Sequence, residues 1–428
     1  AKIAVRSLSF PQSLLSIGQN AFAGCDSLES ITFHPNAKLE SIGQNAFAGS
    51  YVNVDGVYTQ YGPDITTLTI PASVRSIGGN AFFNAFFLES LTFAEGSVLE
   101  EIGTSAFEVE MNYQGTYGNY EYVNYAQDKL SGLVFPSTLI SIGNSAFAGR
   151  TGLTNVVLNE GLTAVSAYAF AMYTGTTGQT YANFDEVAAE WTMASPTELN
   201  IPSSVTTLGN YAFAFWTDLQ TVTFNGNVFI NEEGDASFGD YMFAKSALTS
   251  AEGLKDCTIL EMDYAFAGTP IRSVALPAGV EFSSNTFADA FELMFIDLSA
   301  GRFEWASRLT DDLPADSVFI VAAADLDFYL ADDDWFALAE AGRILVSPGE
   351  VEQPEVTGVR LTFDNNYEGG GSSYATLAEG EATWVPSAPE REGYVFIGWY
   401  VDAECTELFV FGGTLEADTT VYAGWAEA

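Results

Sequence analysis

The nine residues SIGQNAFAG occur twice without change, at positions 16–24 and 41–49. Such a recurrence indicates a chain built from copies of one unit, and the length of that unit limits which folds are open to it. An alignment on the Ala-Phe pair gives ten copies, which lie 21 to 25 residues apart wherever no long insertion separates them. The copies centre on Phe22, Phe47, Phe82, Phe107, Phe147, Phe170, Phe213, Phe243, Phe266 and Phe287.

Each unit carries a short segment whose alternation of apolar and polar residues predicts a β-strand. These segments include LESITF at 28–33, LESLTF at 88–93, LSGLVF at 130–135, LQTVTF at 219–224 and IRSVAL at 271–276. One unit cannot bury its apolar side by itself, so its Leu, Ile and Phe side chains must pack on the units before and after it. We therefore expect the ten phenylalanines to form one continuous buried column.

The repeat pattern LxxIxFPxxLxxIGxxAFxxCxxL resembles the BspA-like leucine-rich repeat of bacterial surface proteins, and residues 11–33 match it nearly letter for letter. The resemblance extends over about residues 5–298 and weakens in the last copies, especially around 244–262. It implies a mainly β fold with short helices, in which a right-handed α/β-type coil of about ten repeats forms a leucine-rich-repeat solenoid. We assign this solenoid to residues 1–298.

Residues 299–346 lose the repeat, and we expect them to form the C-terminal cap that a stack of repeats needs over its last apolar layer. The second half of this segment predicts a strand, a turn, a helix and another strand. Asp332 is expected to cap the helix, and Gly342 to end it. The acidic run 332–334 could also suggest a Ca²⁺ site, but helix capping is the simpler explanation.

A Pro- and Glu-rich linker at 347–356 precedes a second pattern in residues 357–428, which includes EREGYVFIGWY at 390–400 and TTVYAGW at 419–425. This pattern resembles the Listeria–Bacteroides repeat, or internalin B-repeat, and implies a small β-grasp-like domain of the kind found in exported bacterial proteins. Its aromatic residues alternate along the predicted strands, and we expect a core rather than a ligand platform from Tyr394, Phe396, Trp399, Tyr422 and Trp425.

The charge of the chain restricts its partners. Fourteen Lys and Arg against 56 Asp and Glu give a net charge of −42, which argues against nucleic acid and anionic lipid as partners. The sequence has no run of 18 apolar residues, so we expect no direct membrane insertion. The chain begins at Ala1 inside the repeat pattern, and we expect that a preceding segment, such as a signal peptide, has been removed.

The sequence offers no pattern for catalysis, a cofactor or a metal ion. Its single histidine, His34, lies in a predicted turn, and its three cysteines, Cys25, Cys257 and Cys405, are far apart. No phosphate-binding loop, HExxH, GxSxG or EF-hand pattern occurs. We therefore predict no enzyme activity, no cofactor and no metal; the enzymatic alternative is a site assembled from scattered acids.

Three insertions, at about 50–63, 110–129 and 173–194, hold ten of the twenty tyrosines of the chain. They follow the Ala-Phe segment of every second unit, so they should project from one edge of the stack, about 10 Å apart. Such insertions are often a binding face, and Tyr with Gly and Asn is typical of adaptable recognition loops. We predict ligand contacts from Tyr58, Tyr61, Tyr117, Tyr120, Tyr122, Tyr125, Tyr181 and Trp191. The alternative is that these rings pack the insertions onto the solenoid.

A further series of tyrosines falls just before successive Ala-Phe or equivalent pairs, at Tyr168, Tyr211, Tyr241 and Tyr264. The early copies have Asn at this place: Asn20, Asn45 and Asn80. A fixed register of this kind predicts a packing ladder.

These features together predict a secreted or cell-surface bacterial protein that binds a host or microbial protein or glycan. The alternative is a structural spacer that holds another domain, outside this chain, away from the cell envelope.

Overall fold

The protein is described from a computed structural model. The structure describes residues 5–54, 57–109, 113–116, 119–122, 128–172, 194–229, 237–259, 261–282, 285–303, 313–314, 317–347, 358–367, 372–378, 383, 386, 389, 391 and 393–427. The chain divides into two compact units, Ala1–Thr269 with Asn285–Asp289 and Pro270–Ser284 with Ala290–Ala428, called the first and the second unit below.

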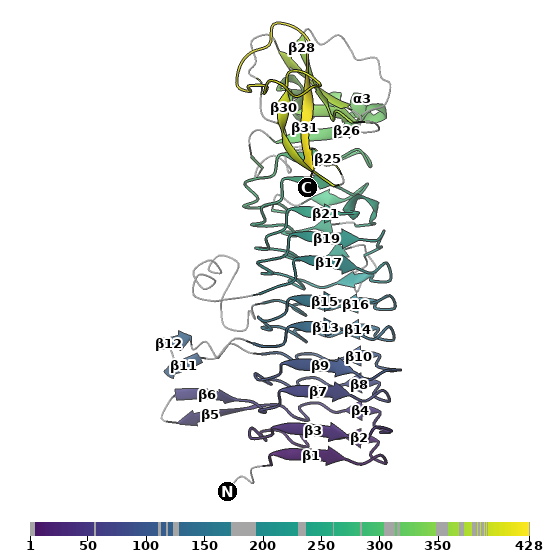
Figure 1. The fold of residues 1–428 in the computed structure, drawn as a ribbon, viewed down its shortest axis with the longest axis vertical. Coiled ribbons are helices and arrows are strands. Elements are labelled where there is room, and N and C mark those ends of the chain that lie inside the picture. The colour runs from purple at the N-terminus through teal and green to yellow at the C-terminus, as the bar shows by residue number, and fades with distance from the viewer. Residues whose placement is uncertain are drawn as a thin grey trace. The chain divides into compact units, whose positions relative to one another are not determined.

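The coils of the first unit contribute two strands each, and strands of neighbouring coils pair in parallel (Figure 1). The longer strands are β1 (Ser7–Phe10), β3 (Ser30–Phe33), β7 (Thr67–Ile70), β9 (Ser90–Phe93), β13 (Gly132–Val134), β15 (Asn155–Val157), β17 (Glu198–Ile201), β19 (Thr221–Phe224) and β21 (Ser250–Glu252), after which comes a short 3₁₀ helix, η3 (Leu254–Asp256). The shorter strands are β2 (Ser16–Ile17), β4 (Ser41–Ile42), β8 (Ser76–Ile77), β10 (Glu101–Ile102), β14 (Ser141–Ile142), β16 (Ala164–Val165), β18 (Thr207–Leu208), β20 (Ser237–Phe238) and β22 (Glu261–Met262). The sequence predicts the longer strands alone, because two residues are too few to show an alternating pattern.

Equivalent residues of neighbouring coils lie opposite each other in both sets of strands. Ser16 pairs with Ser41 and Ile17 with Ile42, and each of these isoleucines is buried. The two copies of SIGQNAFAG therefore occupy equivalent places in the stack and meet the same packing demands, which explains why they are identical.

The ten phenylalanines of the repeat form a single column, as the sequence predicts. Consecutive rings lie nearly parallel, with centroids between 5.1 and 6.0 Å apart along the whole series from Phe22 to Phe287. The rings inside the column are fully buried, whereas Phe22 at its first position is half-buried. This column is the continuous core that joins the coils of the first unit.

The second unit begins with a four-stranded parallel sheet. Its strands lie in the order β23 (Ser273–Ala275), β25 (Phe295–Asp297), β26 (Val318–Ala322) and β27 (Ile344–Ser347), and β24 (Glu281–Phe282) follows β23 in the chain. Between β26 and β27 lie η4 (Ala323–Asp325), α3 (Leu326–Leu330) and α4 (Asp333–Glu340). Asp332 caps α4 as predicted, because its carboxylate accepts hydrogen bonds from the backbone N–H groups of Asp334 and Trp335.

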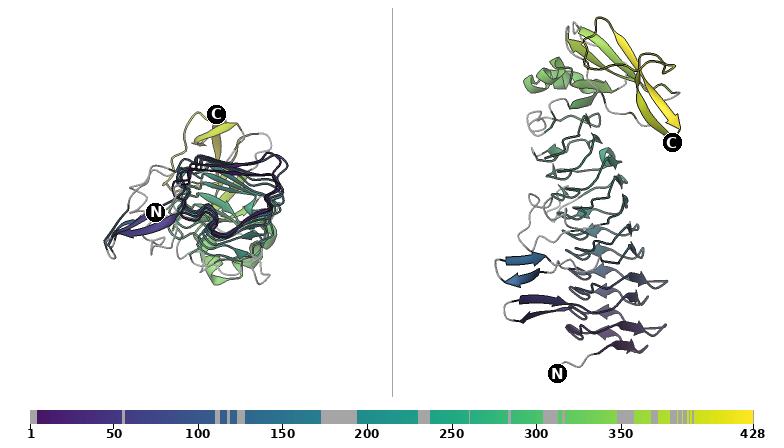
Figure 2. Two further views of the ribbon diagram at one scale, coloured as in Figure 1. Left: turned by 90° about the horizontal axis from the view of Figure 1, so that it is seen from below. Right: turned by 60° about the vertical axis from the view of Figure 1, so that its left-hand side comes forward.

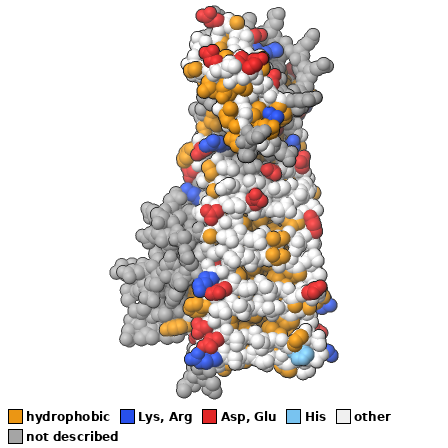
Figure 3. Space-filling view, in the orientation of Figure 1, with side chains coloured by type: hydrophobic (Ala, Val, Ile, Leu, Met, Phe, Trp, Pro, Cys, Tyr) orange, Lys and Arg blue, Asp and Glu red, His pale blue; other side chains and the backbone are white. Residues whose placement is uncertain are grey.

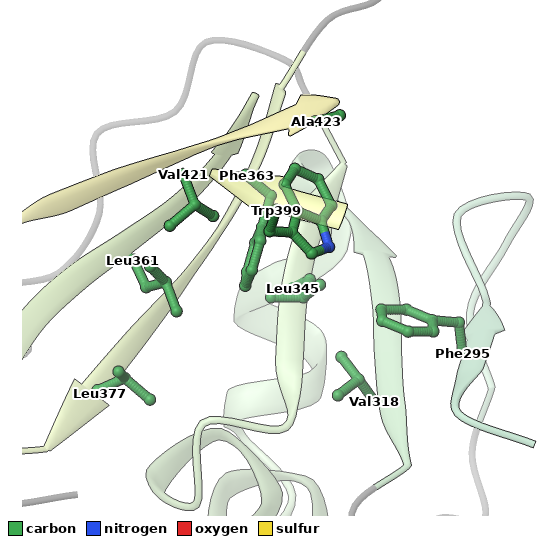
Figure 4. Packing of buried hydrophobic residues seen from close by; sticks show 9 residues of the cluster. All are labelled: Phe295, Val318, Leu345, Leu361, Phe363, Leu377, Trp399, Val421 and Ala423. Carbon is green, nitrogen blue, oxygen red and sulfur yellow. The ribbon is translucent and has the colours of Figure 1, made fainter. Parts of the chain in front are cut away.

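A second four-stranded sheet ends the chain, in the order β29 (Ser372–Ala378), β28 (Gly358–Asp364), β31 (Thr419–Glu427) and β30 (Tyr394–Tyr400). Figure 4 shows that its buried side chains, such as Leu361 and Trp399, belong to one cluster with Leu345 and Val318 of the preceding sheet. The two sheets of the second unit therefore share a hydrophobic core.

The aromatic residues of this last sheet divide into two groups. Trp399 is buried, and Phe396 contacts both Trp399 and Trp425 edge to face, with centroids 5.5 and 5.9 Å away. These three form core as predicted. Tyr394 does not, since it is 36% exposed. It is the first residue of β30, and the Arg391 guanidinium lies 3.8 Å from its ring centroid.

Candidate binding surface

Two of the three insertions form antiparallel β-hairpins. The first consists of β5 (Ser50–Val54) and β6 (Val57–Tyr61), and the second of β11 (Tyr113–Thr116) and β12 (Asn119–Tyr122). Val54 pairs with Val57, so two residues connect the first pair of strands, and the sequence places Asp-Gly there. This dipeptide favours two-residue hairpin connections, because it readily adopts positive φ. The third insertion lies outside the residues that the structure describes.

The two hairpins project from the same side of the first unit and lie next to each other, β11 against β6 (Figures 1 and 2). They form two separate two-stranded sheets. This arrangement agrees with the expectation that insertions at the same point of every second repeat stand side by side. It creates a projecting surface to which both tyrosine-rich insertions contribute.

The structure describes some of the predicted contact residues and not others. Tyr61, the last residue of β6, is 44% exposed. The backbone of Tyr58 lies in β6, and that of Tyr120 and Tyr122 in β12, so the adjacent hairpins bring these positions together. The other predicted contacts fall outside the described residues: Tyr117, Tyr125, Tyr181 and Trp191.

A buried ion pair that the sequence did not predict anchors the base of the second insertion. The Arg150 Nη1 atom lies 2.9 Å from Asp128 Oδ1, and the two side chains are 0% and 4% exposed. Arg150 also donates from Nε to the Phe107 carbonyl (2.8 Å) and from Nη1 to the Ala85 carbonyl (3.1 Å). Burial raises the pKa of Asp128 above its ordinary value, although Arg150 acts in the opposite direction. The only sequence signal is an arginine where the first copy of the repeat has Cys25.

Two further sets of hydrogen bonds join described residues beside the other insertions to neighbouring coils. Ser50, which opens the first hairpin, donates from Oγ to Asp26 Oδ2 at 2.8 Å. Ser195, just after the third insertion, and Asp218 bond reciprocally: each accepts the other's backbone N–H, at 3.0 and 2.8 Å. In both cases the partner belongs to a neighbouring coil, so contacts between coils hold Ser50 and Ser195 in place.

The outward side of the longer strands presents a different chemistry. It consists mainly of small hydroxyl-bearing residues, for example Thr69 and Thr92, whose Oγ atoms lie 2.9 Å apart. Exposed ion pairs also link successive coils: Lys129 with Glu89 (2.8 Å), just before β9, and Arg75 with Glu100 (2.6 Å), just before the shorter strands β8 and β10. In Figure 3 the surface over these strands is mostly white, with a few orange side chains at its centre. Such a face lacks the Trp, Tyr and Arg that dominate binding energy at interfaces.

A second column of side chains, called the left-handed column below, runs along the first unit at the position two residues before each Phe. Nine of its members have a φ between 51° and 58°: Asn20, Asn45, Asn80, Ser105, Ser145, Tyr168, Tyr211, Tyr241 and Tyr264. The four tyrosine rings stack with centroids 4.8, 4.6 and 4.3 Å apart, which confirms the predicted ladder. Burial, and then the neighbouring Tyr264, raise the pKa of Tyr241 to about 12.

Among the described residues, no helix is both long enough and apolar enough to cross a membrane. The same residues contain no group of three or more His, Cys, Asp or Glu side chains arranged to hold a metal ion.

Residues 1–54, 55–114, 118–233 and 190–301 match the BspA type leucine-rich repeat region, with six copies, and residues 360–424 match the Listeria-Bacteroides repeat domain. No curated protein matches the chain.

Three solved structures illustrate the likeness to known folds. The pneumococcal vaccine antigen PcpA is 18% identical over 76% of each chain, with a TM-score of 0.40. A leucine rich cell surface protein from Faecalibacterium prausnitzii is 20% identical over 70% of this chain and 75% of the other, with a TM-score of 0.34. A leucine-rich repeat protein from Bacteroides ovatus is 18% identical over 77% and 82%, with a TM-score of 0.36.

Proposed function

Because this chain belongs to the BspA-type leucine-rich repeat family of bacterial surface proteins, we propose that it is an adhesion protein on the outside of a bacterium. In this proposal it catalyses no reaction. It binds a protein or a glycan on a host or on another microbe, and the tyrosine-rich insertions of the first unit make the contact.

The observation that carries this proposal is the pair of adjacent hairpins. Strand residues two apart share a face, as do residues directly opposite each other in a hairpin. Tyr113 lies opposite Tyr122, and Tyr120 is two residues from Tyr122, so three tyrosine positions belong to one face of the second hairpin. Tyrosine contributes a large, rigid contact area with a polar tip at low cost in conformational entropy, which suits both protein and sugar ligands.

The anchoring at the bases supports a role in recognition. A binding loop that is held by a rigid scaffold loses less conformational entropy when its ligand binds. Arg150 holds the base of the second insertion to two coils by way of Phe107 and Ala85, and Ser50 holds the first through Asp26. The outward side of the strands offers mainly small hydroxyl-bearing residues, so we assign the ligand contacts to the tyrosine-rich insertions.

The test is a glycan and extracellular-matrix array with the wild-type chain and a variant that carries Tyr117→Ala, Tyr120→Ala and Tyr122→Ala. We expect a ligand that binds the wild type and binds the variant at least tenfold more weakly. The matched control carries Thr32→Ala, Thr69→Ala and Thr92→Ala on the strands and should bind normally. Equal binding by the wild type and the tyrosine variant, or binding by neither, would contradict the proposal.

The second candidate is a spacer role, favoured by the regular stack and by the match of residues 360–424 to the Listeria-Bacteroides repeat domain. For this role we propose a solenoid at 1–298, a cap at 299–346, a linker at 347–356 and a repeat domain at 357–428. Deletion of both hairpins, at 50–61 and 113–122, separates the two candidates on whole cells. A spacer lacking them would still support attachment, whereas an adhesion protein would not.

A further inference from the structure

The last sheet of the second unit ends in an open edge strand. β30 pairs with β31 on one side only, and among the described residues no other strand pairs with Val395–Gly398. The same edge is closed farther along the strand, where Phe409 donates to the Trp399 carbonyl and Val401 to the Glu407 carbonyl. Edge strands often carry Lys or Pro, which hinder pairing with another chain. The open stretch Val395–Gly398 carries neither.

One face of the open stretch is apolar and exposed. Val395 and Ile397 are 54% and 50% exposed, and Leu408 of the neighbouring segment is 57% exposed. Leu408 lies opposite Tyr400. Tyr400 and Ile397 share a face, because a Cβ atom added to Gly424 of β31 would lie 2.2 Å from the first and 3.1 Å from the second. We call Val395, Ile397 and Leu408 the apolar edge surface, and such a group of exposed apolar side chains is typical of an interaction site.

The two ends of the open stretch carry opposite charge on the other face of the sheet. Near its start, the Arg391 guanidinium lies 3.8 Å from the Tyr394 ring centroid, and in the described part of the chain no carboxylate forms an ion pair with it. Tyr394 precedes Val395, so its ring lies on the face opposite the apolar edge surface. The exposed Glu407, at the other end, precedes Leu408 and lies on that same opposite face.

We propose that β30 pairs with β30 of a second copy of this chain, antiparallel and about a two-fold axis in the middle of the open stretch. Backbone hydrogen bonds between the two open stretches join the two sheets into one. Residues directly opposite each other in such a pair share a face of the sheet. The apolar edge surfaces of the two copies therefore meet on one face and cover each other.

The antiparallel direction also brings the opposite charges together. It places the start of each open stretch beside the end of the other, so Arg391 of one copy lies next to Glu407 of the second copy. The contact forms twice, because a two-fold interface repeats every pair. The chain turns just before the strand, where the Tyr394 N–H donates to the Arg391 carbonyl at 3.0 Å. It therefore leaves the edge before the segment 407–409 of the second copy begins.

The charge distribution favours a second copy over a partner of one charge sign. An edge with a basic start and an acidic end is complementary to its own reversed copy. The net charge of −42 opposes association, but charges farther apart than about 8 Å are largely screened at physiological salt. We therefore expect a weak dimer. The pairing uses no residue of the hairpins and does not depend on the proposed adhesion role.

Sedimentation velocity of the full chain at physiological salt, from about 2 to about 200 µM, tests the proposal. We expect a monomer–dimer equilibrium with a dissociation constant in the micromolar range. Val395→Lys with Ile397→Lys should weaken the dimer at least tenfold, because it places like charges across the two-fold axis. Val134→Lys with Val157→Lys adds the same charge at two valines of the first unit, 59% and 37% exposed, and should leave the dimer within twofold of wild type.

Exchanged charges test the antiparallel direction. Glu407→Arg should weaken the dimer about fivefold or more, because it brings two arginines together at each end. Addition of Arg391→Glu should restore the dimer to within about threefold of wild type, since the pair is rebuilt with its signs reversed. Thermal unfolding of the lysine variants and of Glu407→Arg at the wild-type temperature ensures that a weaker dimer reflects the surface and not the fold.

Three results would overturn the proposal. In the first, the wild-type chain sediments as a monomer at every concentration. In the second, Val395→Lys with Ile397→Lys dimerises as tightly as the wild type, or the control with lysines at 134 and 157 loses the dimer equally. In the third, Glu407→Arg leaves the dissociation constant unchanged, which would exclude the antiparallel pairing.

Discussion

The phenylalanine column and the left-handed column pass through the same coils, yet only the first keeps one residue type throughout. A ring inside the phenylalanine column is buried on every side, and its neighbours above and below are equivalent rings at 5.1 to 6.0 Å. Any smaller or differently shaped side chain would leave a cavity. The left-handed column is half-buried or exposed, and it changes from Asn through Ser to Tyr along the stack.

Two features of the left-handed column stay the same: its backbone conformation, and the contact of a side chain with the equivalent side chain in the next coil. Asn adopts positive φ more readily than most residues, and Asn45 Nδ2 donates to Asn20 Oδ1 at 2.9 Å. Tyr is an unusual residue at positive φ, and here each tyrosine stacks on another. Stacking of aromatic pairs is worth about 0.5–1.5 kcal/mol each, which offsets the backbone strain. Burial therefore restricts which residue type fits the phenylalanine column. In the half-exposed left-handed column, the backbone conformation and the side-chain contact with the next coil are restricted instead.

The largest effect is expected inside the buried column. Phe147→Ala should reduce the free energy of unfolding by about 3–5 kcal/mol, because it removes a fully buried ring and leaves a cavity. Phe22→Ala is the matched control, and it should cost distinctly less because Phe22 is half-buried at the end of the column. Urea unfolding, with hydrogen exchange to locate the loss, measures both. Equal losses at the two positions would contradict the account of the column.

An intermediate effect is expected where the left-handed column depends on backbone conformation. Asn80 has a φ of 53°, and Asn80→Val should cost about 1–2 kcal/mol because a side chain branched at Cβ is strained there. Asn80→Gly should change stability by less than about 0.5 kcal/mol, since glycine adopts this conformation freely. Equal losses of unfolding free energy in urea for both variants would contradict this expectation. They would show that the amide side chain, and not the backbone conformation, stabilises this position.

The smallest effect concerns the tyrosines and appears only at high pH. The pKa of Tyr241 is about 12 in the folded chain, above the value of about 10 for an exposed tyrosine. A raised pKa contributes stability that is complete below pH 10 and is lost as the pH rises from about 10 to 12. We expect Tyr241→Phe to unfold at nearly the wild-type temperature at pH 7 and to lose less stability than wild type over this pH range. Parallel pH profiles would contradict the prediction.

The sequence allowed the first unit to be predicted in detail, because its core is the same contact repeated in every coil. The resemblance to both repeat families is confirmed by the family matches, and the Asp332 cap follows from a local rule. The two-residue strands were missed because they leave no pattern in a single copy. The Arg150–Asp128 pair was missed because it joins a repeat to an insertion, and no periodicity relates them. The ligand contacts of Tyr58, Tyr120 and Tyr122 stay predictions, since they depend on a partner.

The parallel stacking of Phe47, Phe82 and Phe107 has a consequence for how such a chain changes over generations. Each ring stacks on the equivalent ring in the coil before and on that in the coil after. A duplication or deletion of one whole coil would leave every surviving ring with neighbours of the same shape. The length of the repeat array is therefore free to vary in steps of one coil without any redesign of its buried column.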